Sequence, residues 1–226
     1  MLEIYPRREN QSLKEYVLNN LTQNIVRFAL KPGERLVEDE IGALLKISRT
    51  PIREALLDLS EKKLVDIFPR NGTFVSYINM DIVSEFIYLR QVIERDLSKL
   101  ACQCVTPDDI DKLYENIAIQ KYYYESKKPV KLLECDMRFH SDIYRICGKN
   151  FLNSVVNGLS IHFDRIRFLS MTKKEFLLKI SEHEDYVRAI EAGDAQKAME
   201  ISDLHMYHTF EDYDWIRQEF PQYIEK

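Results

Sequence analysis

The stretch SRTPIREAL, residues 48–56, decides how the first third of this 226-residue chain folds. Three of its residues, Ile52, Ala55 and Leu56, are apolar and share one spacing with Leu59, three residues beyond the stretch. The four recur at i, i+3, i+4 and i+7, which is the spacing of one buried helical face. Thr50 is suited to cap the helix, and Pro51 to hold its first position, where the missing N–H is not needed. The pattern predicts a helix that runs to about Lys62.

The segments on both sides of this helix complete a winged helix-turn-helix. Upstream, apolar stripes predict one helix over residues 12–30 and a short one over residues 38–45. The residues of these two helices that we expect to face the core are Leu13, Val17, Leu21, Ile25, Phe28, Ile41, Leu44 and Leu45. Downstream, strand-like runs at 64–68 and 73–78 flank a loop with Asn71-Gly72, which is a strong hairpin signal.

Two arginines at the start of the central helix lie off its apolar face, where a helix-turn-helix protein contacts base edges in the major groove. Arg53 faces outward, and Arg49 precedes the first turn, where helix N–H groups also favour a phosphate. The wing would place Arg70 in the adjacent minor groove or against the backbone. The alternative is that the arginines only solvate an exposed helix and pair with Glu54 or Asp58.

The overall charge by itself argues against nucleic-acid binding, because phosphate neutralisation needs clustered lysine and arginine. The chain has a net charge of -5, but residues 1–78 carry +1 and the remainder carries −6. Local clustering therefore has to supply the DNA contacts of the first part. No signal-peptide pattern and no apolar run of membrane-spanning length occurs, so we expect a cytoplasmic protein with no membrane partner.

Residues 30–78, LKPGERLVEDEIGALLKISRTPIREALLDLSEKKLVDIFPRNGTFVSYI, resemble the winged-helix domain of the GntR superfamily of bacterial transcription regulators. The features that carry the resemblance are PG-x-x-L, the SRTP-x-REAL helix and a wing with G-x-F-V. The operator contacts that it implies are Arg49, Thr50 and Arg53, with Gly72 at the wing tip. One departure concerns DNA directly, because Asp39 stands where many members carry an arginine that contacts the operator.

The second part of the chain consists of long amphipathic helical segments and holds all five histidines. Asp136 and His140 are four residues apart on one predicted helix, so both can converge on one point. His183 and His205 each share a helical face with apolar residues, which points them inward. One oxygen and three nitrogens from three helices suit a divalent transition metal, but an inward histidine is also common as a hydrogen-bonded core residue. Spacing alone leaves both interpretations open.

The same segments are similar to the C-terminal FCD domain of the FadR branch of this superfamily, an all-helical effector module. The similarity lies in D-x-x-x-H, then EH ahead of AI-x-AGDA, then a histidine about one helix later. It implies four ligands to a divalent transition metal such as Zn, Ni, Mn or Fe: Asp136, His140, His183 and His205. A metal that prefers six ligands keeps two positions open, which a small carboxylate effector can take.

A cationic partner for such an anion is expected in LRQVIERDL, where Arg90 precedes Glu94 by one helical turn. Both match the arginine and glutamate of the family's first effector-domain helix. Arg90 either binds the effector or ties two helices together, and Arg165 and Arg167 are weaker candidates. Two histidines match no motif position, His162 and His208, and the latter is expected at the surface or beside the site.

The sequence therefore predicts a mainly α protein with two domains. Residues 1–79 form a winged helix-turn-helix DNA-binding domain, and residues 80–226 form an all-helical domain for metal binding, effector binding and dimerisation. We expect a ligand-responsive transcriptional regulator, a homodimeric repressor that binds a double-stranded DNA operator. Two alternatives are a regulator for which the metal itself is the signal and a metal-dependent enzyme. The enzyme would need positioned acid–base groups beyond the ligands, which the sequence does not supply.

Overall fold

A computed structural model describes residues 2–171 and 176–225 of the chain. These residues form two units. One unit runs up to Met80 and also includes the C-terminal segment from Phe220, and the other spans Asp81–Glu219. Within the described residues, the named strands all belong to the first unit, and helices make up most of the second. This arrangement confirms the predicted class, a winged helix-turn-helix followed by an all-helical bundle.

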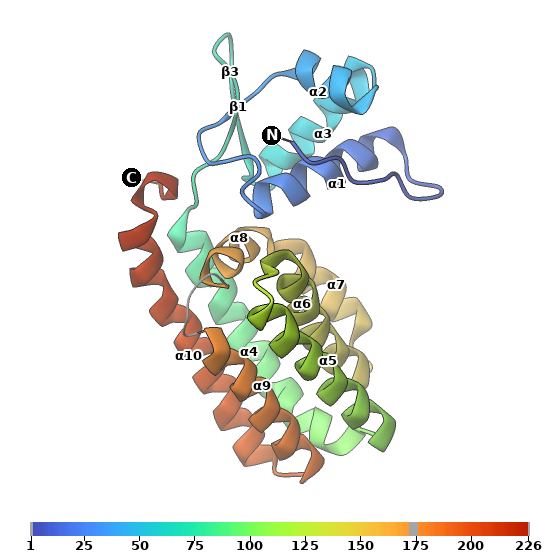
Figure 1. Ribbon diagram of the computed structural model, residues 1–226, viewed down its shortest axis with the longest axis vertical. Helices are drawn as coiled ribbons and strands as arrows, with labels where there is room; N and C mark the ends of the chain where they lie inside the picture. The colour runs from blue at the N-terminus through green and yellow to red at the C-terminus, as the bar shows by residue number, and fades with distance from the viewer. Residues whose placement is uncertain (1, 172–175, 226) are drawn as a thin grey trace. The chain divides into compact units, whose positions relative to one another are not determined.

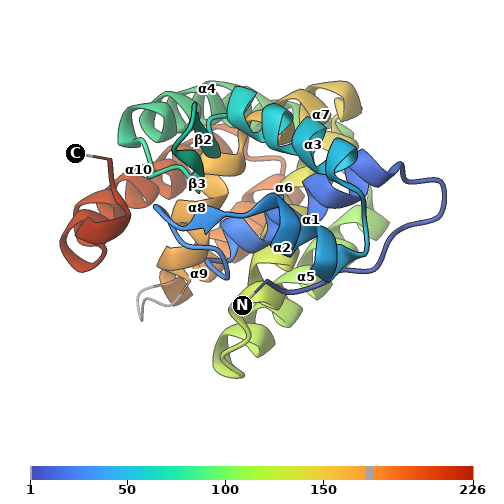
Figure 2. The same cartoon turned by 90° about the horizontal axis from the view of Figure 1, so that it is seen from above.

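The first unit combines three helices with a small sheet (Figures 1 and 2). Its elements are α1 (Leu13–Val26), β1 (Arg35–Leu36), α2 (Glu38–Leu45), α3 (Arg49–Glu61), β2 (Val65–Phe68) and β3 (Gly72–Val75). Helix α3 packs against both α1 and α2. The core of the unit holds side chains with no solvent exposure, among them Leu21, Ile25, Ile52 and Leu59. The apolar periodicity of the sequence thus identified the residues that hold these helices together.

Local capping fixes where the helices begin and end. The hydroxyl of Ser12 accepts a hydrogen bond from the N–H of Glu15, and the Glu15 carboxylate accepts one from the N–H of Ser12, which makes a capping box. Helix α1 ends earlier than the sequence predicted, because Phe28 adopts a positive φ of 57° that a helix cannot contain. Helix α3 has Ser48 as its N-cap, so Thr50 lies in the first turn instead of at the cap.

Two residues that the apolar stripes assigned to the core are exposed instead. Leu13 retains 42% of its accessible surface and Leu44 retains 41%. Both lie near the end of a helix, where the spacing of apolar residues no longer determines which neighbour covers them. Ile41 and Leu45 of α2 are buried as expected.

The wing is a hairpin of β2 and β3 with β1 added along the outer edge of β3, in the antiparallel order β1-β3-β2. The sequence predicted the hairpin but not β1, which has only two residues. At the turn, Arg70 has a φ of 65° and Gly72 a φ of 127°. Gly33 has a φ of 78° and donates its N–H to the carbonyl of Val75 at 2.8 Å, which ties the PG turn to the wing.

The C-terminal segment, which contains the short helix η1 (Pro221–Tyr223), packs on the first unit. The N–H of Ile78 donates to the carbonyl of Tyr223 at 2.9 Å, and the N–H of Glu225 donates to the carbonyl of Ile78 at 3.0 Å. The ring of Tyr223 also lies 5.2 Å from the ring of Phe28, centroid to centroid. The sequence assigned this segment to the helical domain, and these backbone bonds are the reason that it groups with the winged helix instead.

The second unit is a bundle of seven helices in the described part of the chain (Figure 1). They are α4 (Met80–Cys104), α5 (Pro107–Glu125), α6 (Pro129–Ile146), α7 (Asn150–Leu159), α8 (Ile161–Ser170), α9 (Phe176–Glu191) and α10 (Ala195–Glu219). Helix α5 packs on α6 and α9, and α9 packs on α10. None of the described helices combines the length and apolar character that crossing a membrane requires.

Candidate nucleic-acid interface and candidate metal centre

The start of α3 presents two arginines to solvent. The side chains of Arg49 and Arg53 are 64% and 63% exposed, and Thr50 between them is also exposed. The apolar face of the same helix is buried, so these three residues lie on its outer side. Arg70 occupies the turn of the β2–β3 hairpin and is exposed as well, and Gly72 follows it as the first residue of β3. The structure thus brings the predicted DNA contacts to the α3 start and the wing turn of one unit.

Both arginines of α3 are paired with acids from the first turn of α2. Arg49 donates from Nε to Asp39 Oδ1 at 2.7 Å and from Nη2 to Asp39 Oδ2 at 2.8 Å. Arg53 donates from Nε to Glu38 Oε2 at 2.8 Å. The sequence suggested Glu54 or Asp58 as partners on the same helix. Those pairs do not form among the described residues, and Asp58 instead meets Lys14 of α1.

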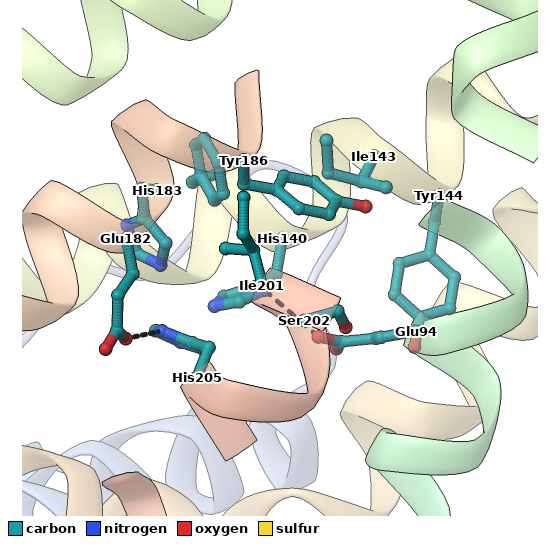
Figure 3. A pocket seen from close by; sticks show the side chains of 11 residues that line it. Glu94, His140, Ile143, Tyr144, Glu182, His183, Tyr186, Ile201, Ser202 and His205 are labelled. Atoms are coloured by element: carbon teal, nitrogen blue, oxygen red, sulfur yellow. Dashed lines mark hydrogen bonds and ion pairs between the residues drawn. The ribbon is translucent and has the colours of Figure 1, made fainter. Parts of the chain in front are cut away.

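A cluster of three histidines lies inside the second unit (Figure 3). His140 of α6, His183 of α9 and His205 of α10 each offer one ring nitrogen, and these three atoms all lie within 4.8 Å of one another. The ring centroids are 4.8 to 5.5 Å apart. His183 is 2% exposed, and it stacks on Phe139 at 4.2 Å. Three of the four predicted ligands therefore converge from three helices.

The Nδ1 atom of each histidine is held by an oxygen of another side chain. Glu94 Oε2 lies 3.3 Å from His140 Nδ1, and Glu182 Oε2 lies 2.7 Å from His205 Nδ1. Figure 3 shows both contacts as dashed lines. A carboxylate can only accept, so each Nδ1 carries the proton and each Nε2 keeps a lone pair. Such carboxylate–histidine pairs fix the orientation of metal-binding imidazoles.

A chain of amides makes the same assignment for His183. The amide nitrogen of Asn116 donates to the backbone carbonyl of Cys135 at 3.1 Å, which directs the Asn116 oxygen towards Gln120. Gln120 donates its amide nitrogen to that oxygen at 2.7 Å, so its own oxygen faces His183 Nδ1 at 3.1 Å. His183 must therefore donate from Nδ1, and its Nε2 is left as an acceptor.

The Nε2 atom of His183 is buried and has no hydrogen-bond partner among the described residues. The nearest charged group is Asp136, whose Oδ1 lies 3.8 Å away, while Asp136 Oδ2 faces Arg167 Nη1 at 3.3 Å. An unpartnered lone pair in a buried site is destabilising unless a ligand completes it. Three imidazole nitrogens and a carboxylate oxygen are a donor set that suits Zn²⁺, Ni²⁺, Mn²⁺ or Fe²⁺, so these residues fit a metal.

Burial and the charges of neighbouring groups have opposite effects on each pKa of the cluster. Burial is the stronger effect for the histidines, and the neighbouring cations together are the stronger effect for the acids. Burial lowers the pKa of His140 to about 4 and holds that of His183 well below its ordinary value. Burial alone would raise the pKa of Asp136 and of Glu94, but Arg167 beside Asp136 and Arg90 beside Glu94 keep both pKa values lowered. At neutral pH, His140 and His183 are therefore neutral and Asp136 and Glu94 are ionised, and a neutral imidazole and an ionised carboxylate are the forms that bind a metal.

Three cavities meet at His140, which lines all of them. The largest of the three, of about 370 Å³, is bounded by apolar side chains such as Ile143 and Ile201 (Figure 3). The second, of about 320 Å³, is lined by three buried cations: Arg90, Arg167 and Lys179. Sequence reasoning ranked Arg167 low and missed Lys179, although Lys179 lies on the same helix as His183, one turn before it.

Arg90 forms its ion pair within its own helix. Its Nε and Nη2 donate to Glu94 at 2.8 and 3.0 Å, one turn along α4. Its guanidinium also lies 5.0 Å from the Phe163 ring of α8, on which Arg167 packs at 4.7 Å. Arg165 is buried but lines none of these cavities.

The remaining histidines differ in their relation to the cluster. His208 contacts the second carboxylate oxygen of Glu182, whose first oxygen contacts His205, so His208 lies beside the site. His162 is buried and lines none of the three cavities. Glu182, Gln120 and Asn116 went unnoticed in the sequence. Only the E of EH, directly before His183, gave a signal for Glu182.

The structure defines a class of protein, a winged helix-turn-helix unit joined to an all-helical unit with an internal histidine cluster. Residues 13–75 match the family described as bacterial regulatory proteins, gntR family, and residues 85–208 match the FCD domain. The chain belongs to the GntR family of bacterial regulators and carries an FCD domain as its second unit.

Relatives that this chain matches over most of their length are named as transcriptional regulators. The HTH-type transcriptional repressor RspR of Escherichia coli strain K12 is 28% identical over 212 residues, 92% of each chain. The gluconate operon transcriptional repressor of Bacillus subtilis strain 168 is 26% identical over 198 residues, 84% of this chain and 79% of the other. The solved structure of Escherichia coli McbR/YncC shares the fold, with a TM-score of 0.76 and 22% identity over 91% of this chain and 99% of that one. The protein is a DNA-binding transcriptional regulator and not an enzyme.

The lowered histidine pKa values predict how the stability of the metal-free protein depends on pH. Unfolded His140 takes up a proton below its ordinary pKa of 6.5, whereas the folded residue resists protonation down to about 4. The free energy of unfolding should therefore fall as pH drops through this window, by about 2 kcal/mol between pH 7.5 and pH 5 for His140 alone. Urea unfolding of chelator-treated protein, followed by circular dichroism at pH 7.5 and pH 5, measures the loss. A His140→Gln variant should lose less, and equal losses in both proteins would contradict the assignment.

Proposed function

We propose that this regulator is a repressor whose DNA binding is controlled by a small organic acid bound at a divalent metal in the second unit. The observation that carries the proposal is the histidine cluster: one ring nitrogen from each of His140, His183 and His205 lies within 4.8 Å of the others, each Nδ1 faces a side-chain oxygen, and Asp136 Oδ1 lies 3.8 Å from His183 Nε2. In this proposal the effector binds at the cluster, and the helix-turn-helix binds or releases DNA in response.

Asp136, His140, His183 and His205 would hold the metal. When bound, the ion supplies positive charge and open coordination positions for an anionic ligand. Glu94, Gln120 and Glu182 act one step further out, because their contacts at Nδ1 set the direction of each ring. The donor set is compatible with Zn, Ni, Mn or Fe.

A small carboxylate is the effector class that the surrounding charges favour. Arg90, Arg167 and Lys179 line the cavity next to the cluster, and each is a buried cation whose charge a carboxylate can complement. Each also has a resident acid partner, so the effector would share these cations instead of pairing with a lone charge. The name of the Bacillus subtilis relative, a gluconate operon repressor, makes sugar acids and hydroxy acids the first ligands to test.

Control requires that the acid bind one arrangement of the protein more tightly than the other, since equal affinity shifts no equilibrium. Because two relatives are named as transcriptional repressors, we expect the effector to bind the DNA-released arrangement of this protein more tightly. Helix α10 offers a covalent route for this change. It carries His205, continues to Glu219 and leads directly into the segment that pairs with Ile78 of the first unit.

A homodimer is the proposed working form on a pseudo-palindromic operator in the cytoplasm. Helix α7 exposes Phe151, Val155 and Leu159 at 83%, 43% and 55%, spaced four residues apart on one face. Helix α4, which lines a cavity together with α7, exposes Tyr88 and Val92. An apolar face of this kind marks an interface, and linking two heads with few phosphate contacts raises operator affinity through effective concentration.

Arg53→Ala should weaken operator binding by about 100-fold or more, because both heads of a dimer lose the same base or phosphate contact. Fluorescence anisotropy with an operator obtained by in-vitro selection measures the affinity. Arg138→Ala removes the same charge from an exposed site on α6 and should leave the affinity nearly unchanged. Equal affinities for wild type and Arg53→Ala would remove Arg53 from the interface.

His183→Ala should abolish metal binding, whereas His162→Ala, which removes a buried histidine outside the cluster, should retain it. Elemental analysis of untagged protein gives the metal content. Thermal shift with a panel of carboxylates, with and without chelator, then separates the roles of the two ligands. Stabilisation by an acid only when metal is present supports the proposal. Operator release by metal supply alone would identify a metal sensor, and no bound metal in wild type would overturn the site.

Phe151→Glu combined with Leu159→Glu should convert the dimer to a monomer and lower operator affinity by about 100-fold or more. Light scattering coupled to size exclusion determines the mass. Tyr122→Glu, at a 55% exposed position on α5, is the matched control and should remain dimeric. A monomeric wild type that still binds its operator tightly would contradict the dimer.

A further inference from the structure

The position of the two acids that pair with the α3 arginines needs a physical explanation. Asp39 and Glu38 lie beside the residues proposed to contact DNA, and both carry the same sign of charge as the phosphates. A carboxylate at such a surface opposes the electrostatic attraction that supplies most of the sequence-independent affinity. Its contribution to DNA binding must therefore lie in something other than affinity.

The geometry of the Arg49–Asp39 pair indicates what that contribution is. A guanidinium has five N–H donors in a planar fork, which form two bidentate edges. Asp39 occupies the edge made by Nε and Nη2, with both carboxylate oxygens engaged at 2.7 and 2.8 Å. The opposite edge, Nη1 with Nη2, still has its outward hydrogens. A bidentate arginine edge is the group that binds guanine O6 and N7 in the major groove.

A second role for these acids is the stabilisation of α2 itself. Glu38, Asp39 and Glu40 all lie in its first turn, where negative charge favours the positive end of the helix dipole. That effect needs no contact with an arginine. Glu40 provides it while forming no ion pair within the described part of the chain, so the dipole does not account for the two-point contact of Asp39.

We infer that Asp39 is a specificity-determining residue of the DNA interface: it holds Arg49 by the Nε edge, presents the other edge to a guanine and disfavours a phosphate as the partner of Arg49. The inference rests on the operator-reading function proposed above. Glu38 acts on Arg53 in the same sense but through one bond, so its effect is the weaker of the two.

Exposed ion pairs restrain a side chain only weakly, and this suits the role. Arg49 and Asp39 are equally exposed at 64%, so the pair can form in free protein and adapt when a duplex arrives. What the Arg49–Asp39 pair improves is discrimination between bases. A bidentate arginine–guanine contact distinguishes bases by about 5- to 100-fold, whereas a phosphate contact distinguishes none.

The test compares full-length wild type, Asp39→Asn, Glu40→Gln and Arg49→Ala. The two acid variants each remove one negative charge from the first turn of α2, but only Asp39→Asn breaks an arginine pair. In-vitro selection from a random duplex pool gives the base preference at each operator position. Titration of a 30-base-pair random duplex at several salt concentrations, roughly 50 to 200 mM, gives the number of phosphate contacts. Circular dichroism checks that each variant folds.

Arg49→Ala should erase the preference at one position of each half-site, and Asp39→Asn should reduce it there by about threefold or more. Asp39→Asn should also bind random DNA more tightly than Glu40→Gln does, with a salt slope steeper by up to about one phosphate contact. Glu40→Gln should keep the wild-type preference. An unchanged preference in Asp39→Asn, or a change at a position that Arg49→Ala leaves alone, would overturn the inference while the operator-reading function stands. A wild type that selects no sequence would overturn that function itself.

Discussion

Charge buried inside a helical bundle is stable only when each ionised group has a partner, and the second unit is arranged around this constraint. Glu94 lies between Arg90 and His140, and Asp136 lies between Arg167 and His183. These contacts determine more than charge balance. An acid that accepts from Nδ1 of an imidazole also fixes the opposite nitrogen, so the direction of each Nε2 follows from groups of the protein itself. The metal-binding geometry that we propose is thus a consequence of how the bundle accommodates its charges.

The DNA-binding unit works under the opposite condition. Its ion pairs at the start of α2 and α3 are exposed to solvent, where they are weak and screened by salt. Weak pairs can be exchanged for contacts with a ligand at little cost, which a nucleic-acid interface requires. The same chemical pair, arginine with carboxylate, therefore stabilises structure in the bundle and directs recognition at the surface. Burial is the difference between the two cases.

Helix α10 connects these two environments in the covalent structure. It provides His205 to the cluster and Asp212 to the buried pair with Lys179, and it ends where the chain enters the first unit again. The linker between Ile78 and α4 is one connection between the units, and this C-terminal segment is a second. Both connections meet at Ile78, which donates to Tyr223 and accepts from Glu225. In the function that we propose, a change at the cluster that moves α10 would reach the DNA-binding unit at Ile78, three residues after β3 ends.

Sequence alone determined the features that depend on near neighbours. The periodicity of Ile52, Ala55, Leu56 and Leu59 defined α3, and the four-residue spacing of Asp136 and His140 placed both on one face of α6, because helical geometry fixes such relations within a turn or two. The same periodicity pointed His183 and His205 inward, and resemblance to a family then implied that they are ligands together with that pair. Tertiary structure decided which residues meet across helices: Gln120 on His183, Glu182 on His205, Asp39 on Arg49 and the C-terminal segment on Ile78. These partners are 10 residues apart for Asp39 and Arg49 and as many as 147 apart for Ile78 and Glu225, and no local periodicity relates them, because packing of whole elements sets their distances.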